Sequence, residues 1–194
     1  MTRDQAVREL QATWSVLNAD IDEAVAYGRA QNTPYAQRAL FRAFFALVEG
    51  LSFQLRQITV ASLDGIPLLS EEELFLLKER VHRIDESGRP KSADLYLQFP
   101  QSLLFSIGTY VKNHGAQFSV ETSGNGWQAF KISCAVRNRL MHPKSSDSLA
   151  PTNDELQALT EASRWWHATL LAMFRVCDES DEYWRQQLPQ DEAT

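Results

Sequence analysis

The sequence has little cysteine and no long apolar run, and each shortage excludes a class of protein. Its two cysteines, Cys134 and Cys177, cannot build a disulfide framework, and both fall in helical patterns where we expect small reduced core residues. The richest apolar segment is interrupted by Arg42, Glu49 and Arg56, so it falls short of the roughly 18 residues that a membrane span needs. The N-terminus also lacks the apolar stretch of a secretory signal. We therefore expect a cytoplasmic protein without a membrane partner.

The sequence also lacks the signatures of metal and cofactor chemistry. It has no Gly-rich phosphate loop, no Cys-x-x-Cys pair and no His-Glu-x-x-His helix. The four histidines lie far apart in the chain, without the spacing of zinc ligands, at His82, His114, His142 and His167. We therefore expect neither a metal site nor a cofactor.

What the sequence does have is an uneven distribution of charge. The net charge of −6 argues against a protein that coats nucleic acid non-specifically. Between Glu121 and Asp147, however, there are four basic residues and no acidic one, so the rest of the chain carries 15 basic against 25 acidic residues. This positive island on an acidic body fits a local anionic ligand such as a phosphate group. Chance clustering of four charges is the alternative.

Hydrophobic periodicity predicts helices along most of the chain. The expected helical ranges are 3–31 (as one or two helices), 35–63, 71–85, 100–113, 127–141 and 153–184. The range 35–63 is apolar on more than one face, as expected for the central helix of a bundle. A polar loop is expected over 86–92, and a short strand or an ordered loop over 117–126. Trp165 and Trp166 continue the apolar spacing of the last helix, which favours core packing for both.

Local signals mark several helix ends. Thr33 has the character of an N-cap, with Pro34 at the first helical position. Ser70 and Thr152 each precede a glutamate by three residues, which is the pattern of a capping box. Pro143 ends the helix over 127–141, because the residue before a proline is disfavoured in helical geometry.

These signals together predict an all-α fold, a helical bundle of about five to seven helices in one domain over 1–194. We expect an N-terminal helical segment over 1–31, the bundle proper over 35–184, and a flexible tail over 189–194.

The most distinctive stretch runs from Arg137 to Pro143, at the end of the helix over 127–141. A helical wheel predicts one apolar row and one polar strip bordered by Arg139; the row is Ile132, Val136 and Leu140, and the strip is Gln128, Lys131, Ala135, Asn138 and His142. In a regular helix Arg139 lies closer to His142 than Arg137 does, but Pro143 biases His142 to leave the helix. The spacing alone fits both a capping histidine with two solvated arginines and a phosphate-binding site.

At these residues the sequence resembles the HEPN superfamily. Its signature is an arginine, a polar residue directly after it, and a histidine five to seven positions after the arginine, near the end of a helix in an all-helical domain. Arg137, Asn138 and His142 match that pattern, and Pro143-Lys144 closes the helix. The resemblance covers about 35–183, and its specific part is about 17 residues long.

The resemblance implies a helical bundle that dimerises so that the two motif helices meet across a twofold axis. Many members are metal-independent ribonucleases, often toxins or antiviral defence effectors, so RNA is the implied substrate. Carried over to this chain, Arg137 and His142 would be catalytic and Asn138 would support them. We take the nearby cations Lys131, Arg139 and Lys144 as candidates for substrate binding.

The chain also departs from the family. Some members carry a tyrosine two positions after the histidine that a cognate antitoxin modifies, and here that position is Lys144. A cognate antitoxin is a candidate partner, but this chain lacks the tyrosine that such an antitoxin would modify. Other members bind without cutting, which leaves two alternatives to a ribonuclease. One is a non-catalytic HEPN-like RNA-binding or regulatory module, and the other is a structural helical partner in a larger complex.

Overall fold

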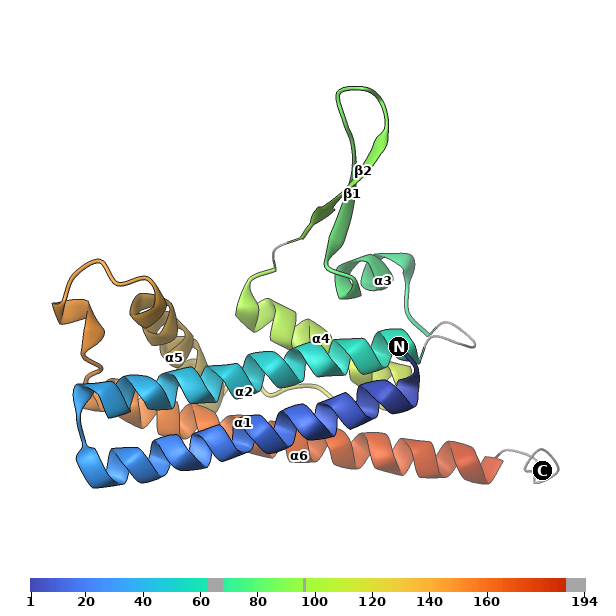
Figure 1. The fold of residues 1–194 in the computed structure, drawn as a ribbon. Helices are drawn as coiled ribbons and strands as arrows, with labels where there is room; N and C mark the ends of the chain where they lie inside the picture. Colours follow the sequence, from blue (N-terminus) through green and yellow to red (C-terminus); the bar gives the residue numbers. More distant parts are fainter. Residues whose placement is uncertain (63–67, 96, 188–194) are drawn as a thin grey trace.

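The computed structural model of the chain describes residues 1–62, 68–95 and 97–187. In these ranges it has six α-helices, one short 3₁₀-helix and a two-stranded antiparallel sheet (Figure 1). In chain order the elements are α1 (Arg3–Gln31), α2 (Pro34–Ala61), α3 (Glu71–Leu77), β1 (Arg80–Ile84), β2 (Pro90–Asp94), α4 (Phe99–Asn113), α5 (Asn125–Met141), η1 (Asp147–Leu149) and α6 (Asn153–Gln187). The prediction of an all-α bundle with five to seven helices is confirmed.

Helix α2 is central to the bundle. It packs against α1, α4, α5 and α6, and Figure 1 shows α1 and α2 running antiparallel with α6 alongside them. Its buried side chains point to more than one face, as the sequence predicted; they include Phe41, Phe44, Phe45, Leu47, Val48, Leu51, Leu55 and Ile58. They join buried residues of α1, α4, α5 and α6 in one apolar cluster. Burial of this kind is the main stabilising contribution to a helical bundle.

The predicted helix ends are confirmed by their hydrogen bonds. The Thr33 hydroxyl accepts from the backbone N–H of Ala36 at 3.2 Å, and Pro34 is the first residue of α2. At Ser70 the capping box is complete, with its glutamate side chain accepting from the Ser70 N–H at 2.7 Å. At Thr152 the matching bond from its N–H to Glu155 is 2.8 Å long. These bonds satisfy backbone groups that a helix start would otherwise leave unpaired.

The prediction for 71–92 was right about where the helix begins, at Glu71, but wrong about the rest of the range. Helix α3 ends at Leu77 and does not continue to Asp85, and the chain turns at Glu79, whose φ is 48°. The range expected as helix end and loop instead forms the β1–β2 hairpin. The 117–126 segment, where a strand was an option, contains no strand. It is an ordered loop until α5 begins at Asn125, two residues earlier than predicted.

Helices α5 and α6 pack closely through aromatic side chains. Trp166 is buried, and the Trp165 ring lies 5.2 Å from the Trp127 ring and 5.1 Å from the Phe130 ring. The expectation of core packing for the tryptophan pair is therefore confirmed. The contact requires Gly126, because a Cβ there would lie 2.5 Å from the Cβ of Trp165.

Two further sequence expectations concern the cysteines and the membrane. Cys134 and Cys177 are both buried and free, as expected. Within 1–62, 68–95 and 97–187, no helix combines the length and the apolar character that a membrane crossing requires. The predicted tail over 189–194 lies outside the described residues.

Candidate active site at the end of helix α5

Helix α5 presents two different faces. Its buried face packs into the bundle through Trp127, Phe130, Cys134, Val136 and Leu140. The predicted polar strip is exposed along its whole length, from Gln128 to His142. One part of the wheel prediction was wrong: Ile132 is 50% exposed and does not belong to the apolar row of Val136 and Leu140.

Arg137 is held in place by two side chains. Its guanidinium forms an ion pair with Glu49 of α2, and a second nitrogen donates to the Oδ1 of Asn138 at 3.0 Å. The side chain of Arg137 remains 29% exposed, so it is partly accessible to solvent. The motif residues Arg137 and Asn138 are thus in contact, and Glu49 joins them from a different helix.

The Glu49 carboxylate stands in an unfavourable environment for its charge. Burial raises the pKa of Glu49 above its ordinary value, and this effect outweighs the lowering by the neighbouring Arg137 guanidinium. The pair therefore orients the arginine without the net stabilisation that an ion pair with a lowered carboxyl pKa would indicate. The neighbouring thiol is no nucleophile, because burial raises the pKa of Cys134 to about 12.

Arg139 has a different environment. It donates to the Oε2 of Glu155 at 2.8 Å, the same oxygen that accepts from the Thr152 N–H at the start of α6. Burial acts to raise the pKa of Glu155, but the hydrogen bonds from Arg139 and from the Thr152 backbone outweigh it and leave this pKa below its ordinary value. Arg139 thus fastens the end of α5 to the first turn of α6. Its guanidinium is thereby engaged in a contact between two helices.

His142 leaves the helix, as its proline neighbour predicted. It is the C-cap of α5, with φ −129° and ψ 63°, and its backbone N–H still donates to the carbonyl of Asn138 at 3.0 Å. The imidazole is exposed and has no hydrogen-bond or ion-pair partner among the described residues. The imidazole is therefore available to a ligand from solvent.

The two lysines of the positive island are exposed as well. Lys131 lies on the same strip of α5 as His142, three helical turns away, which corresponds to roughly 16 Å along the axis. Lys144 lies in the segment after α5. Neither has an ion-pair partner in the part of the chain that the structure describes. These cations line an open surface and do not converge in one pocket.

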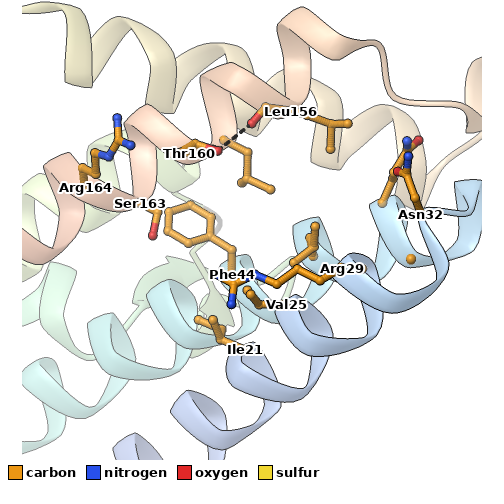
Figure 2. A pocket seen from close by; sticks show the side chains of 14 residues that line it. Ile21, Val25, Arg29, Asn32, Phe44, Leu156, Thr160, Ser163 and Arg164 are labelled. Carbon is orange, nitrogen blue, oxygen red and sulfur yellow. Dashed lines mark hydrogen bonds between the residues drawn. The ribbon is translucent and has the colours of Figure 1, made fainter.

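An apolar groove lies elsewhere, between α1, α2 and α6. Its volume is about 490 Å³, and Figure 2 shows Phe44 and Leu156 lining it together with Arg29 at one side. The titratable side chains that line it are Arg29 and Arg164. Because arginine stays protonated, this groove offers no group that exchanges protons near neutral pH. It is not the candidate active site.

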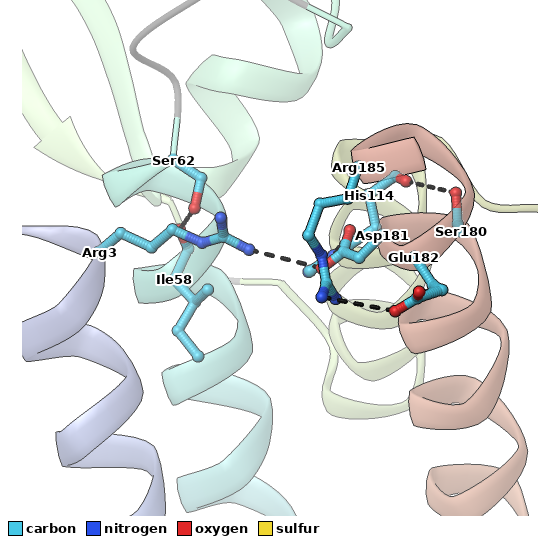
Figure 3. Close-up of polar contacts among 8 residues, drawn as sticks. All are labelled: Arg3, Ile58, Ser62, His114, Ser180, Asp181, Glu182 and Arg185. Carbon is cyan, nitrogen blue, oxygen red and sulfur yellow. Dashed lines mark hydrogen bonds and ion pairs between the residues drawn. The ribbon is translucent and has the colours of Figure 1, made fainter. Parts of the chain in front are cut away.

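A second histidine forms a conspicuous polar cluster at the opposite end of the bundle (Figure 3). The Nδ1 of His114 lies 2.8 Å from Asp181, and Ser180 donates to the His114 carbonyl at 2.8 Å. Arg3 approaches Asp181 at 3.8 Å. However, His114 is only 9% exposed and its Nε2 is buried, so a polymeric substrate cannot reach it. This cluster ties the end of α4 to α6 and is a structural contact.

Comparisons of the chain with protein-family models, with curated proteins and with solved structures found no match. The candidate site therefore stands on its residues and their geometry. Within the described residues, no group of three or more His, Cys, Asp and Glu side chains is arranged to hold a metal ion.

The sequence predicted Arg137, Asn138 and His142 at one helix end, where the structure has them, but it did not reveal the carboxylate partners of the two arginines. In the sequence Glu49 stands only as a charge that interrupts an apolar segment, and Glu155 only as the glutamate of a capping box. A signal existed for both, since each is an acidic residue on a helix that must pack against α5. Which acid meets which arginine depends on the packing itself.

Proposed function

We propose that this chain is a metal-independent endoribonuclease of the HEPN type, acting as a homodimer in a toxin or antiviral defence system. The observation that carries the proposal is that the two arginines of the motif make different contacts. Arg137 is oriented by Glu49 and Asn138 and remains partly exposed beside an unpartnered histidine, whereas Arg139 is used to fasten two helices. An arginine and a histidine at one exposed helix end supply the groups that RNA cleavage needs.

The chemistry proceeds by transesterification. The 2′-hydroxyl of the substrate loses its proton to one imidazole, and its oxygen attacks the adjacent phosphorus. The bond from phosphorus to the 5′-oxygen breaks as a second imidazole protonates that oxygen. The products are a 2′,3′-cyclic phosphate and a free 5′-hydroxyl. Arg137 stabilises the extra negative charge on the phosphorus centre, and Glu49 with Asn138 keeps its guanidinium in position.

One chain offers one histidine for this reaction, so a dimer is part of the proposal. The exposed side of α5 carries apolar surface, with Ile132 50% exposed. Ala135, three residues later and on the same side of the helix, is exposed too. Burying this strip against its symmetry copy would bring two copies of His142 towards one axis. Two histidines can then serve as base and acid.

The test is product analysis with purified protein and RNA. We expect His142→Ala to lose at least about a hundredfold in rate, because general acid–base catalysis contributes roughly 10² to 10⁴-fold. His167→Ala, which removes an exposed histidine on α6, serves as the matched control and should keep full activity. Cleavage should survive excess EDTA, give a 2′,3′-cyclic phosphate by mass spectrometry, and fail where the 2′-hydroxyl is blocked. Equal cutting of DNA, or activity lost with EDTA and restored by magnesium, would contradict the mechanism.

The alternative function is a non-catalytic RNA-binding or regulatory module. It is favoured by one observation, that the motif lies on an open surface of the chain and not in a pocket. RNA binding by the pure dimer without any cleavage would select this function. A cognate antitoxin or another activator belongs to either proposal as a further partner.

A further inference from the structure

The β1–β2 hairpin projects from the helices as a separate arm (Figure 1). Its base is firmly anchored. The Leu95 N–H donates to the Glu79 carbonyl at 2.8 Å, and the Glu79 carboxylate pairs with Arg56 at 3.0 Å. Arg56 is only 8% exposed and also donates to the hydroxyls of Ser102 and Ser106 on α4. The arm is therefore held at its root by a buried guanidinium.

The tip of the hairpin is ordered by its own turn. The Asp85 carboxylate accepts from the N–H groups of Ser87 and Arg89 at 2.8 and 2.9 Å. Gly88 has a φ of 73°, a conformation that glycine adopts without strain. The charge of Asp85 is thus engaged within the turn, and the free acidic side chain at the tip is the exposed Glu86.

The strand register brings two positive charges together. Arg83 of β1 lies directly opposite Lys91 of β2, and both are exposed. Neither has a carboxylate partner among the described residues. Like charges directly opposite on neighbouring strands destabilise a sheet, by roughly 0.2 to 1 kcal/mol on the scale of cross-strand pairs. Over 78–91 the sequence has five basic and three acidic residues, although the whole chain has a net charge of −6.

A two-stranded hairpin is marginally stable in water on its own, and this one carries a repulsive pair as well. An anionic partner would turn the repulsion into attraction. A phosphate backbone fits better than an acidic protein, because it carries closely and regularly spaced negative charges and because the two cations are neighbours on one face.

We propose that the β1–β2 hairpin is a nucleic-acid arm, and that Arg83 and Lys91 bind the phosphate backbone of the RNA at a place separate from the cleaved bond. The inference rests on the proposed ribonuclease function and adds a second contact to the same substrate. Binding at the arm is insensitive to base sequence, since phosphate contacts position a nucleic acid without reading it.

The test compares the double variant Arg83→Gln/Lys91→Gln with wild type on a long single-stranded RNA and on a dinucleotide substrate. For the long RNA we expect the dissociation constant to rise roughly tenfold at low salt. The slope of log K against log salt should become shallower by about 1 to 1.5, because two phosphate contacts at roughly 0.7 each are lost. Turnover of the dinucleotide, which occupies only the cleaved position, should not change. The matched control is Arg8→Gln/Arg175→Gln, the same change of charge on exposed helix positions.

The outcomes separate the arm from the active site. If the double variant binds the long RNA as tightly as wild type, or if the control variant weakens binding equally, the proposed RNA binding by the hairpin is wrong. The proposed ribonuclease activity is unaffected by that result. A wild type that neither binds nor cuts RNA overturns both, and tight binding of an acidic protein in its place would identify the other partner class. Thermal unfolding gives a second readout. The melting temperature of the double variant should be unchanged or higher, and a fall of several degrees would show that the pair is structural.

Discussion

At the scale of single residues, two arginines on one helix illustrate two uses of an ion pair. Arg139 meets a carboxylate whose pKa is lowered, so the charged pair is favourable in the folded protein. Arg137 meets a carboxylate whose pKa burial raises, so the folded state disfavours the charge of its partner. A carboxylate whose pKa is raised by burial although an arginine pairs with it is the kind of perturbed group that functional sites often contain.

The difference predicts opposite effects of removing each carboxylate charge. The pKa of Glu155 is depressed in the folded state, so its contribution to stability is present above the ordinary pKa of 4.5 and is lost as the pH falls through the folded pKa. Glu155→Gln should therefore lower the free energy of unfolding at pH 7 by about 1 kcal/mol, or roughly 2 to 4 °C in melting temperature. The difference from wild type should shrink towards zero in acid. Thermal unfolding followed by circular dichroism across the pH range measures it.

Glu49→Gln is the matched comparison on the other pair. Because the folded-state pKa of Glu49 is raised, its ionisation lowers stability as the pH rises above the ordinary value. The glutamine variant should melt at pH 7 at the same temperature as wild type or higher, while losing RNA cleavage through a poorly oriented Arg137. A loss of stability as large as that of Glu155→Gln would show that the Arg137 pair is structural and would remove the argument for its special role.

The sequence predicted the placement of Arg137, Asn138 and His142 at the end of a helix because this placement depends on local rules. Helical spacing puts the first two on the last turns of α5, and the proline after His142 ends the helix. The partners Glu49 and Glu155 could not be predicted in the same way. They belong to other helices, and contacts between helices depend on packing that no local pattern encodes.

At the scale of elements, the hairpin is the part that sequence reasoning missed. The capping box at Ser70 predicts where α3 begins, but no glycine or proline marks its end at Leu77. Val81 and Ile84 are three residues apart, a spacing that fits a helix as well as a strand. Five-residue strands are too short for alternation to decide between the two. The sequence predicts a loop at Gly88. It does not show that this loop brings the residues on either side of it together as paired strands.

The contact between α5 and α6 yields a prediction at the same scale. Gly126→Ala adds a Cβ that would lie 2.5 Å from the Cβ of Trp165, an atom close to the backbone that cannot swing away. We expect a loss of about 1 to 3 kcal/mol of stability, as for overpacked interiors. Gly108→Ala in α4 is the control, because a Cβ there meets nothing within 4 Å. This variant should gain about 0.5 to 1 kcal/mol, since alanine favours a helix over glycine. Urea unfolding distinguishes the two, and equal effects would contradict the close approach of the helices.

At the scale of the whole molecule, the fold class followed from the sequence because long helices with strong periodicity dominate it. The three longest helices, α1, α2 and α6, were all predicted, and in each of them apolar residues recur every three or four positions. Within a single chain the candidate site lacks part of what the proposed reaction needs. A single chain presents one Arg137, one His142 and an open strip of α5, and the proposed reaction needs a proton donor and a proton acceptor together.

The dimer can be tested without touching any catalytic residue. Ile132 lies on the exposed strip of α5 and is 50% exposed in the single chain, so a charge there is harmless to the folded chain but not to a buried symmetric contact. We expect wild type to give about twice the 22.1 kDa chain mass in light scattering, whereas Ile132→Glu should give the mass of one chain and lose cleavage. Leu171→Glu, which places the same charge on an equally apolar position of α6 that is 56% exposed, should remain dimeric and active. Cleavage by a monomeric Ile132→Glu protein would contradict the two-chain site, because one histidine would then be serving as both base and acid.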